Sequence, residues 1–138
     1  MGGLLAAVYA WLYRETVPDF AALPPEDRLE ALIEAVFAPK AFSRDTLTAW
    51  LTLWGQIAVT PALLAEHQRQ YRVYLSNVSD AIAALATARG RNVDARALAV
   101  PLICLIDGIC VQQCMDPDLI GPEAAKQVCR AFLAPHLG

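Results

Sequence analysis

The chain has 138 residues, of which 57% are hydrophobic and 18% are charged, and its formal net charge is −3. This length suits one domain. An acidic chain without clustered Lys and Arg is unsuited to binding nucleic acid through its own surface. Its mean hydropathy of +0.38 exceeds what a domain this small can hide from water. We therefore expect a membrane or a partner subunit to cover the excess apolar surface.

A membrane-spanning segment is not indicated by the sequence. The longest apolar run, residues 97–106, is closed by Asp107 and is shorter than the roughly 20 residues that a spanning helix needs. The apolar N-terminal stretch lacks the preceding Lys or Arg and the small-residue cleavage site of a signal peptide. We predict a cytoplasmic protein with no membrane partner, which buries its apolar surface in a homodimer.

Apolar residues recur every three or four positions between Pro and Gly punctuation, a pattern that predicts helices. The first predicted helix carries the stripe Leu4, Leu5, Val8, Trp11 and Leu12. The second opens at Pro25 and stops at Pro39, and the third is capped by Ser43. The fourth spans residues 61–88, and Gly90 fits its C-terminal stop.

The fifth predicted helix, capped by Asn92 and reaching Met115, is apolar almost all the way round. Such a helix is expected to be buried on every side, and Pro101 is expected to kink it. The sixth spans residues 122–134. No segment alternates like a strand, so we predict one all-α domain over residues 1–138, a six-helix bundle whose neighbouring helices run roughly antiparallel.

Four short segments together resemble a known family. They are RLEALI at residues 28–33, WLTLW at 50–54, PALL at 61–64 and LIDGI at 105–109. Their order and spacing are similar to the C-terminal domain of TetR-type transcriptional repressors, in particular the choline-responsive BetI branch. The resemblance extends over about residues 3–133. The N-terminal helix-turn-helix domain of the family has no counterpart in this chain, so DNA is expected to be bound only through a domain missing from it.

The resemblance implies an effector pocket inside the bundle and a dimer formed by the last two helices. Trp50 and Trp54 share one helix face, and His67, Tyr71 and Tyr74 share another. Aromatic faces attract cations such as a choline-like ligand, although aromatic stripes are also common in cores. The predicted pocket residues are Trp50, Trp54, His67, Tyr71, Tyr74, Leu105 and Asp107. The predicted interface residues are Leu102, Ile103, Ile106, Ile109, Cys110, Val128 and Phe132.

Asp107 lies in the most apolar stretch, where a carboxylate must be paired with a cation or hydrogen-bonded. It could counter a cationic ligand or serve a structural contact. Cys104, Cys110, Cys114 and Cys129 lie in helical context without zinc-ligand spacing, which favours structural thiols, with a redox switch as the alternative. No catalytic motif, cofactor motif or metal motif is present.

The sequence therefore predicts a non-enzymatic, small-molecule-sensing and dimer-forming regulatory domain of a TetR/BetI-like repressor. In the full-length protein, effector binding would alter DNA binding by shifting the population of two conformations. Two alternatives stay open. The chain could be a dimerisation or partner-docking module without a ligand, or a redox-sensing helical protein that uses its cysteines.

Overall fold

The computed structural model describes Ala7, Trp11, Phe20 and residues 22–138. Within these residues the chain forms five α-helices and one 3-10 turn, and contains no strand. The elements are η1 (Pro25–Asp27), α2 (Arg28–Val36), α3 (Arg44–Ile57), α4 (Pro61–Ala88), α5 (Ala95–Met115) and α6 (Pro122–Leu137). The all-helical prediction is confirmed. Of the first predicted helix, with its stripe from Leu4 to Leu12, the structure describes only Ala7 and Trp11, both helical, and the rest lies outside the described residues.

Local side-chain chemistry accounts for the helix ends. The Ser43 hydroxyl accepts a hydrogen bond from the Thr46 backbone N–H at 3.2 Å, as predicted for the start of α3. The start of α5 was assigned to the wrong cap, because Asp94 and not Asn92 accepts the Ala97 N–H, at 3.1 Å. Gly90 follows α4 with a φ of +66°, the left-handed conformation that ends helices readily at glycine.

The two proline positions inside helices do not end them. α5 continues through Pro101, and α6 continues through Pro135 to Leu137, three residues beyond its predicted end. Pro135 lies in the last turn of α6, where its missing N–H removes the hydrogen bond to the Ala131 carbonyl but only two residues of the helix follow.

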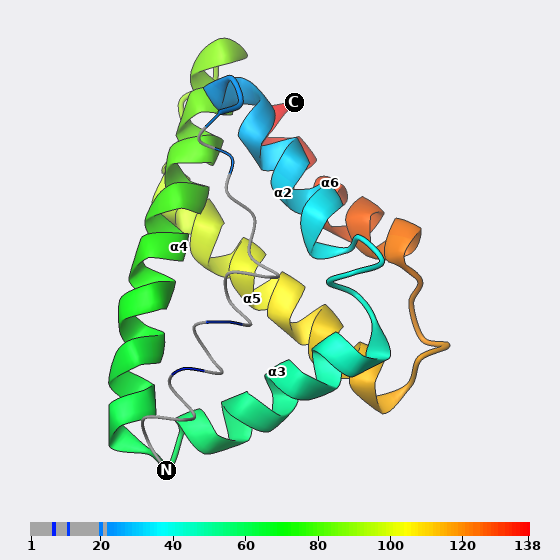
Figure 1. Ribbon diagram of the computed structural model, residues 1–138. Coiled ribbons are helices and arrows are strands. Elements are labelled where there is room, and N and C mark those ends of the chain that lie inside the picture. Colours follow the sequence, from blue (N-terminus) through cyan, green and yellow to red (C-terminus); the bar gives the residue numbers. More distant parts are fainter. Residues whose placement is uncertain (1–6, 8–10, 12–19, 21) are drawn as a thin grey trace.

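Three helices enclose the middle of the molecule. α3, α4 and α5 form the sides of a triangle, with α2 and α6 packed on the outer side of α5 (Figure 1). The chain turns by 120° between α3 and α4, so the prediction that neighbouring helices run roughly antiparallel is wrong for this pair. The short connection ends at Pro61, which starts α4 at once, and α3 packs on α5 as well as on α4.

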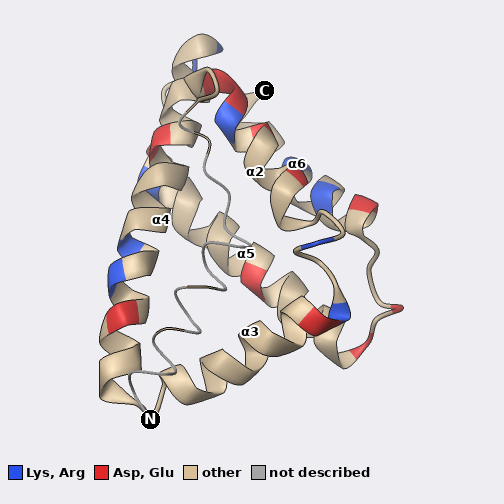
Figure 2. Ribbon diagram, viewed as in Figure 1, with Lys and Arg blue, Asp and Glu red and all other residues tan. Residues whose placement is uncertain are grey.

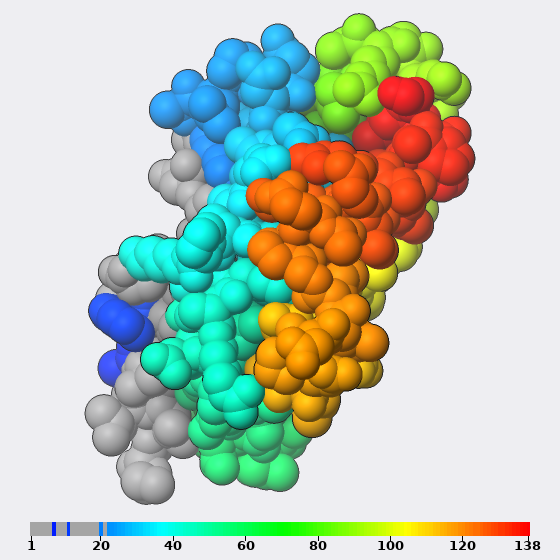
Figure 3. Space-filling model, turned by 90° about the vertical axis from the view of Figure 1, so that its right-hand side faces the viewer, coloured from blue at the N-terminus to red at the C-terminus, as the bar shows by residue number. Residues whose placement is uncertain are grey.

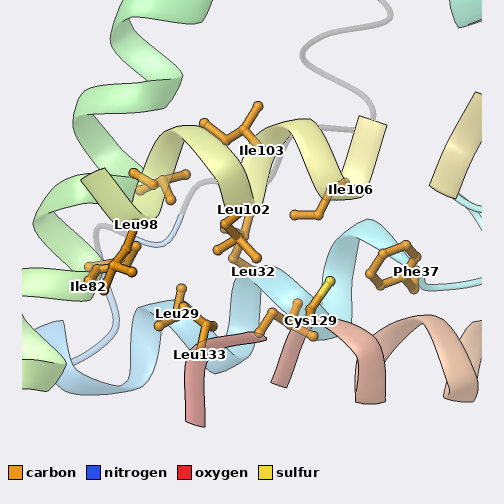
Figure 4. Packing of buried hydrophobic residues seen from close by; sticks show 14 of the residues in the cluster. Leu29, Leu32, Phe37, Ile82, Leu98, Leu102, Ile103, Ile106, Cys129 and Leu133 are labelled. Atoms are coloured by element: carbon orange, nitrogen blue, oxygen red, sulfur yellow. The ribbon is translucent and has the colours of Figure 1, made fainter. Parts of the chain in front are cut away.

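The main core lies where α2, α4, α5 and α6 meet. Leu29 and Leu32 of α2 lie close to Leu102 of α5 and to Cys129 and Leu133 of α6 (Figure 4). A second, smaller core near the turn between α3 and α4 consists of Leu53, Ile57 and Leu63, with Trp50 and Trp54 packed against it.

Within the single chain α5 is buried on one side only, and the predicted cover of its other side by a second copy stays a prediction. Leu102 and Ile106, predicted for the dimer interface, are 0% and 4% exposed inside this chain, and Ile103 and Ile109 are buried as well. The opposite side of α5 is open, with Val100 43% exposed. By length and composition α5 is apolar enough to cross a membrane, and so is the bent pair of α3 and α4 if it counts as one span, but a core helix meets the same criteria.

Ion pairs connect α2 and α6 along their exposed edges. Arg130 contacts Glu30 and lies 2.6 Å from Glu34, and Lys126 lies 2.9 Å from both Glu34 and Glu123. Charged residues are sparse along α3 and α5 in comparison (Figure 2). Figure 3 shows α6 beside α2 on the face turned to the viewer. The carboxylates of these pairs are exposed, so the pairs of Arg130 contribute little each, whereas Lys126 is buried and needs its carboxylate partners.

The substitution Leu102→Ala should lower the free energy of unfolding by about 3–5 kcal/mol, because it leaves a cavity at a fully buried position. Val73→Ala, at a half-exposed position on α4, should change it by about 0.5 kcal/mol or less. Urea unfolding of both variants at one protein concentration measures the difference. A loss below about 1 kcal/mol at Leu102 would contradict the described core.

Candidate functional site

A cavity of about 80 Å³ lies inside the triangle of α3, α4 and α5. A single buried water needs roughly 10–15 Å³, so this volume suits a compact small molecule. Its walls are mostly apolar and aromatic, as in ligand sites generally. The lining residues are Val36, Ala41, Leu47, Trp50, Leu51, Trp54, Tyr71, Tyr74, Ile106, Asp107, Cys110, Val111 and Cys114.

Asp107 is the acidic residue at this cavity. The Tyr71 hydroxyl on α4 donates a hydrogen bond to its Oδ2 atom at 2.9 Å. Burial raises the pKa of the Asp107 carboxyl to about 6, and the bond from Tyr71 partly offsets this rise. At pH 7 the site therefore holds a carboxylate that is largely removed from water and has lone pairs left to accept further donors.

Two further aromatic rings of α4 pack against the Tyr71 ring. The Tyr71 and Tyr74 rings meet edge to face with centroids 5.8 Å apart. The His67 ring packs on Tyr71, with centroids 4.2 Å apart and planes inclined by 34°. Burial lowers the pKa of His67, which favours a neutral imidazole at pH 7. The His67 ring therefore packs against the tyrosine whose hydroxyl is hydrogen-bonded to Asp107.

Five of the seven predicted pocket residues line the cavity, namely Trp50, Trp54, Tyr71, Tyr74 and Asp107. His67 and Leu105 are not among its lining residues, and a role for them in effector binding stays a prediction. Leu105 is two positions from Asp107, about 200° round the helix. It lines a separate groove of about 620 Å³ with Cys104, Gly108, Ile109, Gln112, Leu119, Ile120 and Ala124.

The sequence reasoning missed residues on α5 that share the Asp107 face. Cys110, Val111 and Cys114 follow Asp107 by three, four and seven positions and line the cavity with it. Helical spacing alone places such residues on one face. Cys110 was predicted for the dimer interface, and in the structure it lies at the cavity.

Trp54 carries a polar atom that has no partner in the part of the chain that the structure describes. Its indole Nε1 is buried and has no hydrogen-bond acceptor among the described residues. Native structures leave few buried donors unpaired, because the desolvation of such a group costs about 1–3 kcal/mol. Trp54 packs on Leu53, Ile57 and Leu63 on its other side, and these side chains offer no acceptor.

The four cysteines differ in how far they are exposed to water. Burial raises the pKa of Cys110 to about 12 and that of Cys129 to about 11, so both thiols stay protonated at pH 7. Cys104 is exposed, and Cys114 is half-buried. The described residues contain no group of three or more His, Cys, Asp or Glu side chains that could hold a metal ion.

The exposed side of α5 adjoins the exposed side of α6. Cys104 and Gly108 are exposed on α5, and a Cβ atom added at Gly108 would meet no atom within 4 Å. On α6, Val128 is 39% exposed and Phe132 is partly buried. Of the predicted interface residues, these two on α6 are therefore accessible to a partner, whereas the buried α5 residues are not.

The stability of the protein should depend on pH through Asp107. The unfolded chain loses this proton near pH 3.8, and the folded protein loses it near pH 6. Unfolding between these values releases a proton, so the free energy of unfolding falls as the pH rises through this window and levels off above it. The full change corresponds to about 3 kcal/mol.

Asp107→Asn should remove most of this pH dependence and make the protein more stable than the wild type at pH 7.5. Asp80→Asn, at an exposed position of α4, should leave the pH profile unchanged. Urea unfolding of the three proteins from pH 4.5 to 7.5 measures the effect. An Asp107→Asn profile as steep as that of the wild type would place the titrating group elsewhere.

Comparison with known proteins identifies the family. Residues 25–138 match the family described as "BetI-type transcriptional repressor, C-terminal". The chain is 28% identical over 120 residues to the HTH-type transcriptional regulator BetI of Rhizobium meliloti (strain 1021), an alignment that covers 85% of this chain and 56% of that protein.

A solved structure has the same fold. A crystal structure from Pseudomonas aeruginosa PAO1, described as a transcriptional regulator, is similar with a TM-score of 0.72 and 26% identity over 97% of this chain and 64% of that one. The chain thus spans somewhat more than half the length of the relatives it matches. By the match of its residues 25–138, the chain belongs to the BetI-type transcriptional repressor family and carries the family's C-terminal domain.

Proposed function

We propose that this chain is the small-molecule-sensing and dimer-forming regulatory domain of a cytoplasmic transcriptional repressor. The observation that carries the proposal is the cavity between α3, α4 and α5, where a partly buried carboxylate lies among aromatic rings. DNA would be bound through a helix-turn-helix domain outside the sequence considered, since this acidic chain has a net charge of −3. The role is regulatory and not enzymatic, as in its family.

The chemistry of the cavity favours a compact cationic effector of the choline type. Asp107 is ionised above about pH 6, and its burial leaves the charge poorly compensated by water. A ligand cation would compensate this charge. The rings of Trp50, Trp54, Tyr71 and Tyr74 line the same cavity, and each ring face near a cation would contribute about 0.5–2 kcal/mol.

Effector binding would act on the spacing of the helices. The cavity lies between α3 and α4, where the chain turns by 120°, and α5, which also presents the exposed apolar side. A ligand that binds one spacing of these helices better than another shifts the equilibrium by its difference in affinity. In the full-length dimer this shift would change the separation of the two DNA-binding domains.

Two alternatives receive less support. A partner-docking module would not need a buried carboxylate beside a cavity, since such a charge is unfavourable without a function or a compensating contact. A redox sensor needs accessible thiolates, and Cys110 and Cys129 are held protonated by burial. The absence of any ligand response would nevertheless favour the docking module.

Choline should raise the melting temperature of the protein and change its tryptophan fluorescence in a saturable way. Asp107→Asn should weaken binding at least about tenfold at pH 7.5, because the neutral amide cannot compensate the cation. Wild-type affinity should also fall from pH 7.5 to pH 5, as the carboxyl becomes protonated. Asp80→Asn is the matched control and should bind as the wild type does. Undiminished binding by Asp107→Asn would contradict the role of the carboxylate.

The dimer should form through the exposed apolar sides of α5 and α6. Val128→Glu introduces a charge at a position 39% exposed in the single chain. If a second copy covers this position, the unpaired charge should convert a micromolar dimer into a folded monomer. Val73→Glu, at a half-exposed position on α4, should stay dimeric. Sedimentation velocity measures the state, and circular dichroism checks the helix content. A wild-type monomer, or a dimer of Val128→Glu, would contradict this interface.

A further inference from the structure

The indole N–H of Trp54 is a donor at the cavity that no described residue pairs with. The nitrogen is buried, and no acceptor lies within hydrogen-bond distance of it among the described residues. An indole nitrogen can only donate. A cation would contact the face of the Trp54 ring, whereas the unpaired nitrogen lies at the edge of the ring.

The surroundings of Trp54 indicate where an acceptor could come from. One side of the residue packs against the small core of Leu53, Ile57 and Leu63, whose side chains are wholly apolar. Trp54 also lines the cavity beside Tyr71 and Asp107. Because the nitrogen is itself buried, a molecule in the cavity would reach the indole N–H by a shift of the Trp54 ring toward it and would then supply the acceptor oxygen.

The other polar groups at the cavity set a second requirement, because the ligand must also carry a group that suits Asp107. The Tyr71 hydroxyl is already committed to Asp107 at 2.9 Å, so it does not need the ligand as an acceptor. The Asp107 carboxylate can accept more hydrogen bonds than this one. The cavity therefore offers one unused donor on α3 and one acidic acceptor on α5.

We propose that Trp54 is a specificity-determining residue, which selects effectors carrying a hydrogen-bond-accepting oxygen by donating its indole N–H to that oxygen. This inference rests on the proposed effector pocket. It adds a condition that a cage of ring faces does not impose: the effector is a small molecule with an oxygen at one end and a cationic or N–H group at the other. A site with an unpaired buried donor rejects ligands that lack the matching group.

Two matched pairs of ligands isolate the oxygen. Choline and n-propyltrimethylammonium differ by a hydroxyl against a methyl group, and both are cations. Cyclopentanone and methylenecyclopentane differ by a carbonyl oxygen against a methylene group, and both are neutral. The wild-type chain should bind the oxygen-bearing member of a pair about three- to tenfold more tightly, as expected for one hydrogen bond.

The variant Trp54→Phe removes the N–H while keeping an aromatic ring, and it should reduce this preference to about one. Trp50→Phe is the matched control, because Trp50 also lines the cavity one helical turn away and loses the same part of its ring. The preference should persist in Trp50→Phe. Comparing ratios within one variant removes any general loss of affinity or stability from the result.

Nitrogen-15 spectra give a readout of the N–H itself. The three tryptophans give three indole signals, and the one missing in Trp54→Phe belongs to Trp54. Its proton should shift downfield with choline or cyclopentanone, and much less with the ligands that lack oxygen. A merely structural role for Trp54 would give no such difference between the members of a pair.

The outcomes separate this inference from the proposed function. A Trp54-dependent preference in the neutral pair without binding of either cation would support the role of Trp54 and overturn the cationic effector. Equal binding of choline and n-propyltrimethylammonium by the wild type would support the cation pocket and overturn the role of Trp54. If none of the four ligands binds, both are overturned.

Discussion

The structure depends on how the apolar residues of α5 are divided between its two sides. One side, which includes Leu102 and Ile106, is covered by α2, α4 and α6. The other side remains open at Val100 and Cys104. The helix that organises the core is therefore also the helix whose open side is proposed to bind a second copy. The proposed dimer interface and the hydrophobic core therefore share one helix, α5.

The divergence of α3 from α4 creates the site. Had the two helices run antiparallel, their side chains would have filled the space between them, as in a regular bundle. The turn of 120° leaves a cavity that α5 closes from the third side, and Asp107 enters it from there. The raised pKa of this carboxyl and the unpaired indole of Trp54 both follow from the same exclusion of water. The desolvated carboxylate and the unpaired indole N–H both lower the stability of the protein, and a ligand that pairs with both groups would offset this cost.

Most helix bounds and the family could be predicted from the sequence, because Pro, Gly and Ser43 punctuate it and because periodicity reflects local geometry. The pocket aromatics on α3 and α4 were also predictable, since residues one turn apart share a face. Asn92 was mistaken for the cap of α5 because Asp94, two residues later, has equivalent chemistry. The misplaced Leu105 shows the limit of motif-based assignment: it belongs to the same short motif as Asp107 but points to the other side of the helix.

By itself, the sequence determined the all-helical class, the positions where helices start and stop, and the surplus of apolar surface, because these follow from composition and from interactions within a few residues. Only the tertiary structure decided which side of α5 is core, which of its residues line the cavity, and which donor stays unpaired. Each of these depends on the angle between helices distant in sequence. That angle results from packing many side chains at once, and no single segment specifies it.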